Sequence, residues 1–145
     1  MFILTIVISR NLEMGANGSH ANGSIASEMG REWKTIGVAA GVQIIQRKNP
    51  KASNKLPEES HTPDRIYAVF ERDGSDVKAI AQYDSEGKKL WEIHTTDHDS
   101  LGVHIHPWEN GRPVQYKVGN KVRNVAYPLT DKQQELLEKI RKYGN

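Results

Sequence analysis

The sequence predicts an α+β fold in which a small antiparallel β-meander sheet carries a C-terminal helix packed on it. Three short runs rich in β-branched and aromatic residues lie between positions 65 and 94. Turns that combine an acidic residue with glycine separate these runs, at Asp73-Gly74 and at Asp84–Gly87. One amphipathic run at about 130–143 follows and has the pattern of a capped helix.

The N-terminal residues 1–24 are expected to form a flexible or edge-strand extension ahead of a single α+β domain, residues 25–145. The run Met1–Ser9 is apolar but too short to span a bilayer, and it lacks the basic leader of a signal peptide. Two copies of Ala-Asn-Gly-Ser follow, a composition typical of flexible linkers. A start at Met14 fits this pattern as well as a start at the first methionine.

Between this extension and the meander the sequence predicts three elements. Apolar residues recur every four positions over Ser24–Trp33, which favours a short helix, although Gly30 weakens it. The Val- and Ile-rich segment Ile36–Gln46 is typical of one buried strand. The polar segment Arg47–Pro63 contains three prolines and is expected to be an irregular surface loop.

The meander itself is expected to have two distinct faces, because alternate side chains of a strand point to opposite sides. On its last strand Trp91 and Ile93 share one face, whereas Leu90, Glu92 and His94 share the other. The last strand thus ends on a histidine and leads into a histidine-rich loop. Its three strands are predicted over 65–72, 77–83 and 88–94.

Downstream of the meander, Val103–His106 is predicted to be a short fourth strand that stops at Pro107, which cannot donate to a ladder. A second hairpin is predicted from Val114–Val118 and Val122–Tyr127, around a Gly-Asn turn. The final helix, Thr130–Tyr143, opens with a capping box, presents one apolar stripe and precedes a glycine.

The composition sets limits on the partners and on the chemistry. With 145 residues the chain has the size of one domain, and its net charge of +2 does not indicate strong generic affinity for nucleic acid. No membrane partner is expected. The absence of cysteine excludes disulfides and thiolate zinc sites, so any metal site must use His, Asp or Glu.

Histidine is concentrated in one stretch of the chain, since four of the six histidines lie between positions 94 and 106. Imidazole is the commonest metal ligand and titrates near neutrality. The candidate metal ligands are His94, His98, His104 and His106, with zinc or manganese as the candidate ions. On an extended backbone the two rings of His104-Ile-His106 point to the same side, close enough to share a metal or a proton.

Acid–base catalysis without a metal is the alternative chemistry for the same cluster. A ribonuclease that uses the 2′-hydroxyl needs one group to accept a proton, another to donate one, and cations for the phosphate. The candidate catalytic residues are His104, His106 and His94. Arg112 and Lys117 are candidate phosphate contacts, and Trp108 is a candidate stacking surface for a base unless it packs in the core.

A third interpretation is that the cluster is a polar loop in a binding or structural module. His61 has two interpretations of its own. It could fold back over the sheet and join His104 and His106, or the Thr62-Pro63 pair could simply set an extended backbone ahead of the first meander strand, because a residue before proline avoids the helical region.

About a third of the chain, residues 56–108, resembles a small domain of bacteriophages and prophages. The resemblance rests on a His-Thr-Pro-Asp-Arg-Ile-Tyr sequence ahead of a strand meander, Tyr-Asp at its second turn, and a closing His-x-His. In that family the domain occurs as a tail on minor head (head-morphogenesis) proteins and as short stand-alone proteins. The matching positions are Glu59–Phe70, Gly74, Ile80, Tyr83-Asp84, Gly87, Ile93 and His104–His106.

The resemblance implies a phage- or prophage-derived accessory module that acts by binding, with a phage head protein or another protein as partner. It places the protein in the bacterial cytoplasm or the virion. Similar histidine-ended domains look like effector modules of bacterial polymorphic toxins, which implies a toxin-like ribonuclease as the alternative, beside a histidine-ligated metal-dependent hydrolase. The pattern ends near Trp108, and the rest of the chain extends beyond it.

Overall fold

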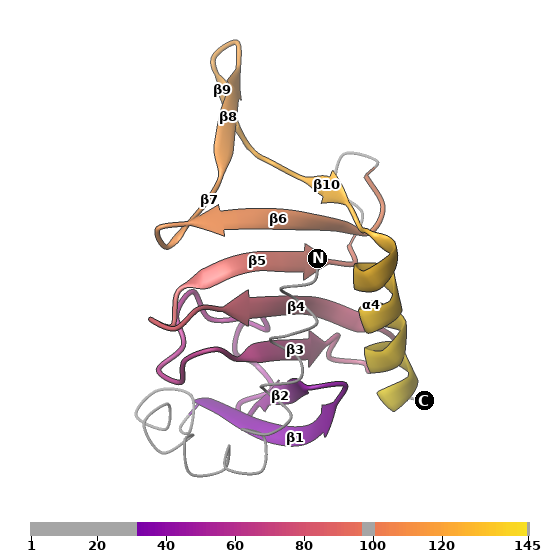
Figure 1. The fold of residues 1–145 in the computed structure, drawn as a ribbon. Coiled ribbons are helices and arrows are strands. Elements are labelled where there is room, and N and C mark those ends of the chain that lie inside the picture. The colour runs from indigo at the N-terminus through magenta and orange to yellow at the C-terminus, as the bar shows by residue number, and fades with distance from the viewer. Residues whose placement is uncertain (1–31, 97–100, 145) are drawn as a thin grey trace.

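The computed structural model describes residues 32–96 and 101–144 (Figure 1). The predicted N-terminal extension lies outside this part of the chain, as does the predicted helix up to residue 31. The described residues form an eight-stranded sheet, a separate two-stranded sheet, and a helix α4 (Asp131–Tyr143) packed on one face of the larger sheet. The predicted α+β class is confirmed.

The sheet is larger than the predicted meander, and one of its strand pairs is parallel. Its strands follow the order β1-β2-β3-β4-β5-β6-β10, with β7 on the outer edge of β6, and β2 pairs with β3 in parallel. The two-stranded sheet is the hairpin β8–β9. The strands are β1 (Trp33–Ala39), β2 (Val42–Arg47), β3 (Ile66–Phe70), β4 (Val77–Tyr83), β5 (Lys89–His94), β6 (His104–Glu109), β7 (Arg112–Pro113), β8 (Gln115–Val118), β9 (Lys121–Asn124) and β10 (Tyr127–Pro128).

The predicted meander is confirmed as β3, β4 and β5, which pair antiparallel in chain order. Both predicted turns contain a glycine with a positive φ, 73° at Gly74 and 80° at Gly87, and glycine adopts this conformation without steric cost. The alternation on the last strand is also found, since Ile93 lies in the core beneath the helix and Glu92 lies on the opposite face.

The prediction of one strand over Ile36–Gln46 is wrong, because the chain reverses in its middle. Ala40 and Gly41 both have positive φ angles, 52° and 76°, and connect β1 to β2 as a tight hairpin. This backbone has the right-handed twist of a two-residue hairpin turn. Trp33, predicted as the end of a helix, is instead the first residue of β1.

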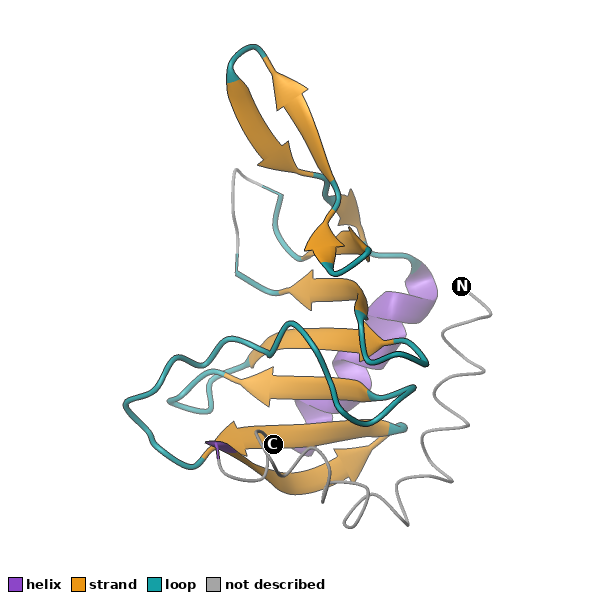
Figure 2. Ribbon diagram, turned by 90° about the vertical axis from the view of Figure 1, so that its left-hand side faces the viewer, coloured by secondary structure: helices purple, strands orange, loops and turns teal. Residues whose placement is uncertain are grey.

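The segment between β2 and β3 is irregular, as its three prolines predict, and it crosses the sheet on the side opposite the helix (Figure 2). Two parallel strands require such a crossover. Leu56 anchors the segment by packing with Tyr67 and Tyr83 in a second core, and the Tyr83 hydroxyl donates to the carbonyl of Pro57. The sheet is therefore covered by a helix on one face and partly by a loop on the other.

Helix α4 begins and ends as the sequence predicts. Thr130 and Gln133 form both hydrogen bonds of a capping box, and Gly144 is the C-cap. Its apolar stripe of Leu136, Leu137 and Ile140 is buried against the strands. In the described ranges no helix is long and apolar enough to cross a membrane.

A bidentate ion pair fixes the C-terminal end of this helix to the start of β4. The Arg141 guanidinium donates from Nε to Asp76 Oδ1 at 2.8 Å and from Nη2 to Oδ2 at 3.0 Å. The hydrogen bonds from Arg141 lower the pKa of the Asp76 carboxyl, even though partial burial works against this shift. The pKa of Asp76 is thus lower in the folded state than in the unfolded state. The pair therefore stabilises the fold fully at a pH above the unfolded-state pKa, and this stabilisation is lost as the pH falls through the folded-state pKa.

Asp76→Asn is therefore expected to lower the free energy of unfolding by about 0.5–1 kcal/mol at neutral pH, a modest effect because both side chains are partly exposed to solvent. The difference from the wild type should shrink below about pH 3.8. Urea unfolding over a pH series measures it. The control Glu135→Gln removes a carboxylate from the exposed pair with Lys139 and should change stability by less than about 0.5 kcal/mol; an equal effect of both substitutions would contradict the prediction.

The predicted stop at Pro107 is wrong, because β6 continues through it to Glu109. The Pro107 carbonyl accepts a hydrogen bond from Val114 N, on the side of β6 that faces away from β5. The nitrogen and carbonyl of one residue point to the same side of a strand, so the N–H that proline lacks is not needed for pairing with β5.

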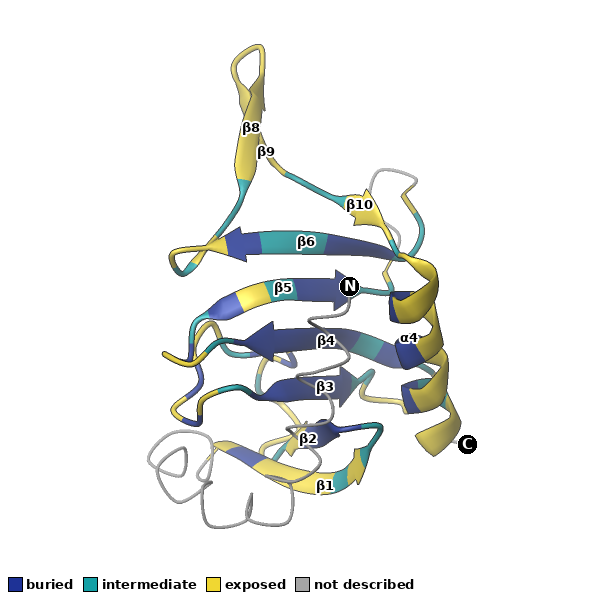
Figure 3. Ribbon diagram, in the orientation of Figure 1, coloured by how far each residue is buried: buried dark blue, intermediate teal, exposed yellow. Residues whose placement is uncertain are grey.

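The second predicted hairpin is present as β8–β9 and extends beyond the sheet (Figure 1). All the residues of its two strands are exposed (Figure 3). The predicted strand Val122–Tyr127 is shorter than expected: β9 ends at Asn124, and Tyr127 belongs to β10, which pairs with β6.

Candidate functional site

Three of the candidate histidines meet on the sheet face opposite the helix. His94 on β5 and His104 on β6 are directly paired across the strands, and His106 lies two residues further along β6. One nitrogen from each ring is within 4.8 Å of the others. Ring centroids are 4.7 Å apart for His104 and His106, and 4.8 Å apart for His94 and His106. The predicted histidine cluster is therefore present.

Strand alternation explains which residues join the cluster. Ile93 and Ile105 point into the core beneath the helix, so their neighbours in sequence point to the other side. Within this group the burial differs: His104 is fully buried, whereas His94 and His106 are partly exposed. The cluster thus has a closed end and an end that solvent reaches.

Two backbone carbonyls determine which nitrogens of the β6 histidines face each other. His104 Nδ1 lies 2.7 Å from the Gly102 carbonyl, and His106 Nδ1 lies 2.8 Å from the Val125 carbonyl. A carbonyl can only accept, so each Nδ1 must carry a hydrogen and donate it. In a neutral ring this assignment leaves the lone pair on Nε2.

The Nε2 atoms of His104 and His106 face each other at 3.0 Å. Two lone pairs at this distance repel unless a positive charge lies between them, either a proton or a metal ion. For comparison, two nitrogens that bind one tetrahedral zinc at about 2.0–2.1 Å lie roughly 3.3 Å apart. The pair is therefore arranged either to share one proton or, after a small adjustment, to bind a metal.

A buried ion pair lies beside the histidines. Glu92 is paired across the strands with His106, and its Oε2 lies 3.1 Å from His94 Nε2. Its Oε1 accepts from Lys89 Nζ at 2.7 Å, and both side chains are almost fully buried. The ammonium of Lys89 also lies 4.3 Å from the centroid of the Trp108 ring, within range of a cation–π interaction.

The surroundings shift the pKa values of these groups. Burial lowers the pKa of Lys89, and its attraction to Glu92 only partly offsets this. Burial raises the pKa of Glu92, but the hydrogen bond from His94 and the charge and hydrogen bond of Lys89 outweigh burial and leave it below its ordinary value. Burial, together with repulsion from His94 and His104, lowers the pKa of His106. A neutral His106 is the form that binds a metal.

The other predicted site residues lie elsewhere. His98 falls outside the described residues. His61 is exposed, and the hydrogen bond from Ser60 N to the Gly87 carbonyl places its loop at the turn between β4 and β5. This turn lies at the start of β5, whereas His94 is the last residue of β5. His61 therefore lies at the opposite end of the strand from the histidine cluster and does not join it. The interpretation that Thr62-Pro63 leads into the first meander strand fits the structure better.

The residues predicted to contact nucleic acid are not brought together in one place. Trp108 is 9% exposed and packs beneath the Lys89 ammonium, so the packing interpretation holds and base stacking is not supported. Arg112 and Lys117 are exposed, the latter on the projecting hairpin. The interspersed charges of the meander, Lys89 and Glu92 among them, predict a solvated sheet face, and this prediction is wrong for these two residues, which are buried. The signal for Glu92 was present, since alternation puts it on the same face as His94.

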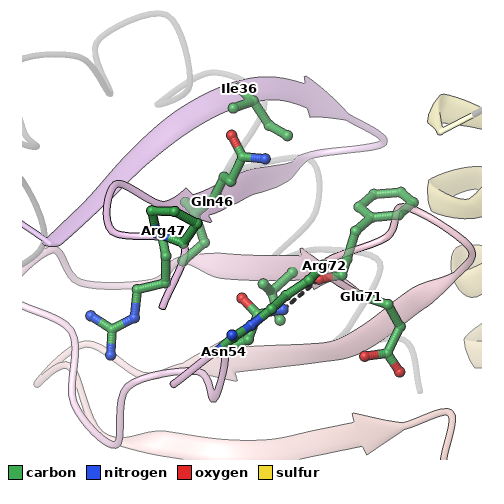
Figure 4. A pocket seen from close by; sticks show the side chains of 10 residues that line it. Ile36, Gln46, Arg47, Asn54, Glu71 and Arg72 are labelled. Carbon is green, nitrogen blue, oxygen red and sulfur yellow. Dashed lines mark hydrogen bonds between the residues drawn. The ribbon is translucent and has the colours of Figure 1, made fainter. Parts of the chain in front are cut away.

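A separate pocket lies near β1, β2 and the end of β3 (Figure 4). Two arginines line it, but both serve to hold the crossover loop, since Arg47 Nε donates to the Ser53 carbonyl at 2.6 Å and Arg72 donates to the Ala52 carbonyl. Asn54 similarly donates to the Phe70 carbonyl at 2.6 Å. Three polar side chains of this pocket are thus engaged in holding the loop, which leaves the histidine group as the stronger candidate site.

The chain was compared with protein-family models, with curated proteins and with solved structures. None of them matches. The candidate function therefore rests on the geometry of the histidine group.

Proposed function

We propose that the protein binds a divalent transition-metal ion through His94, His104 and His106, and that this centre is of the hydrolytic type. The observation that carries the proposal is the pair of Nδ1–H groups held by the Gly102 and Val125 carbonyls, which turns the two Nε2 lone pairs toward each other. Metal-bound histidines typically donate their second nitrogen to a carbonyl or carboxylate in this way.

The donor set favours zinc over manganese. Three neutral imidazoles suit zinc, whereas manganese prefers oxygen ligands. Three protein ligands with one position left for water form the usual composition of a catalytic zinc site, where the metal lowers the pKa of its bound water. In this scheme His94 would bind the metal through Nδ1, because its Nε2 faces Glu92 at 3.1 Å and the carboxylate orients the ring.

Metal analysis of the untagged protein tests this proposal. We expect one zinc per chain and tight binding in a competition titration, with His104→Ala weakening zinc binding by about a hundredfold or more. His61→Ala is the matched control, because it removes an exposed histidine outside the group and should leave the affinity unchanged. No zinc binding by the wild type, or an equal loss in both variants, would show that the proposal is wrong.

The second candidate is the metal-free acid–base pair. It is favoured by the 3.0 Å separation of the two Nε2 atoms, which suits a hydrogen bond that shares one proton. In this case RNA cleavage should persist in excess chelator and disappear in His104→Ala and in His106→Ala. Cleavage that requires added zinc supports the metal centre instead. The phage or prophage origin implied by the sequence resemblance is not tested by the comparisons and stays a prediction.

A further inference from the structure

The β8–β9 hairpin is a two-stranded ribbon that extends away from the main sheet (Figure 1). All residues of its two strands are exposed (Figure 3), and the side chains of Tyr116, Val118 and Val122 are each about half exposed. A two-stranded ribbon in water has little stability of its own, and both faces of this one are open to a partner. The ribbon therefore has the form of a binding element.

Charge is distributed unevenly along the chain, and the ribbon carries the positive part. Residues 110–130 contain four basic residues, Arg112, Lys117, Lys121 and Arg123, and no Asp or Glu. Since the whole chain has a net charge of +2 and this segment contributes +4, the rest of the chain has a net charge of −2. Three of these charges, those of Lys117, Lys121 and Arg123, lie on the ribbon, and Arg112 lies on β7, so the small overall charge conceals a basic ribbon.

The strand register shows how these side chains are arranged. Tyr116 is paired with Arg123, and Val118 is paired with Lys121, so these four lie on one face of the ribbon. Lys117 and Val122 are paired on the opposite face. Each face therefore carries cations, and the first face adds an aromatic ring beside an arginine.

We propose that this ribbon binds double-stranded DNA by entering the major groove, with Lys117, Lys121 and Arg123 contacting phosphates. The major groove of B-form DNA is about 12 Å wide and about 8.5 Å deep and admits a two-stranded ribbon. Strands of four residues, Gln115–Val118 and Lys121–Asn124, extend roughly 13 Å, which is enough to reach the floor of the groove. Cations on both faces match the phosphates on both sides of the groove.

The arrangement fits DNA better than a membrane or an apolar protein groove. The two valines lie on opposite faces, so the ribbon has no continuous apolar side to insert or to bury. Its turn is Gly119-Asn120, followed by Lys121, and such a polar tip is unsuited to a hydrocarbon layer. Duplex RNA is disfavoured because its major groove is too deep and narrow for side chains to read.

Binding of a fluorescent DNA duplex of about 20 base pairs, followed by anisotropy over a salt series, tests this proposal. With three phosphate contacts the slope of log affinity against log salt should be about −3. Replacing Lys117, Lys121 and Arg123 together by glutamine should weaken binding at least about tenfold and bring the slope close to zero. Lys121→Gln alone should reduce the slope by about 1 and guards against an effect of the triple variant on folding.

The matched control removes the same charge elsewhere, by replacing the exposed Lys34, Lys51 and Lys132 with glutamine. These residues lie on β1, on the crossover loop and on α4, and the control should change DNA affinity less than about twofold. No DNA binding by the wild type at low salt would overturn the proposal. So would an equal loss in the control, or binding of phosphatidylserine vesicles in preference to DNA.

Discussion

Glu92→Ala is expected to lower the free energy of unfolding by about 3–5 kcal/mol. The substitution leaves the Lys89 ammonium without its carboxylate partner in a site where its side chain is fully buried. It also removes the acceptor that faces His94. Urea denaturation at neutral pH in the presence of a chelator measures the loss without any contribution from bound metal.

Replacing both partners separates the cost of an unpaired buried charge from the value of the pair itself. The double variant Lys89→Met with Glu92→Leu keeps the volume and removes both charges, and it should recover most of the stability that Glu92→Ala loses. A loss below about 1 kcal/mol for Glu92→Ala would mean that Lys89 reaches solvent or loses its proton at little cost. A double variant no more stable than Glu92→Ala would contradict the burial argument.

Gly87→Ala is expected to destabilise the fold by about 3 kcal/mol or more. Its φ of 80° costs a residue with a side chain about 1–2 kcal/mol. In addition, an added Cβ would overlap the carbonyl oxygen of Ser60, a backbone atom that cannot rotate away. Ser60 N donates to the Gly87 carbonyl at 2.7 Å, so relieving this overlap also strains the bond that holds the crossover loop to the meander.

Gly74→Ala is the matched control, because Gly74 has a similar φ of 73° and nothing lies within 4 Å of the added Cβ. It should cost only the conformational part, about 1–2 kcal/mol. The two variants are compared by thermal and urea unfolding. Equal losses would show that the contact with Ser60 relaxes without cost and that only the backbone conformation matters.

Local signals in the sequence were sufficient for the elements that have recognisable turn, alternation or capping residues of their own. The meander β3–β5 and helix α4 have turns, alternation and caps that act within a few residues. The β1–β2 hairpin was missed because its turn, Ala40-Gly41, lacks the usual Asn or Asp. The parallel pairing of β2 with β3 has no local signal at all, since a long loop separates the two strands.

The candidate site was predicted in part for the same reason. The alternation of His104 and His106 is a local property, and the position of His94 at the end of a strand is also local. The contacts of the two rings with the carbonyls of Gly102 and Val125 could not be predicted, because every residue has a backbone carbonyl and the sequence does not show which one faces a given side chain. Val125 moreover lies 19 residues from His106. Lys89 was missed because a lysine near the start of a strand is usually solvated, whereas here Glu92 and Trp108 enclose it.

The overall charge averages over the chain and does not show where the charge is concentrated. The value of +2 is the sum of a basic ribbon and a slightly acidic remainder. Electrostatic attraction acts over about one Debye length, roughly 8–10 Å in physiological salt, so a partner at the ribbon responds to the local charge rather than to the total. Charge counted over each predicted element is therefore more informative than one value for the whole chain.

The proline in β6 also affects how the molecule meets copies of itself. The outer edge of β6 is divided, since β10 pairs at His104 and Ile105 and β7 pairs at Trp108 and Glu109. Between them lies Pro107, which has no N–H to offer an incoming strand. Edge strands with long rows of unpaired amides promote strand addition and aggregation, and proline is one of the means that prevent it. This edge of the sheet is thereby protected against extension by another chain.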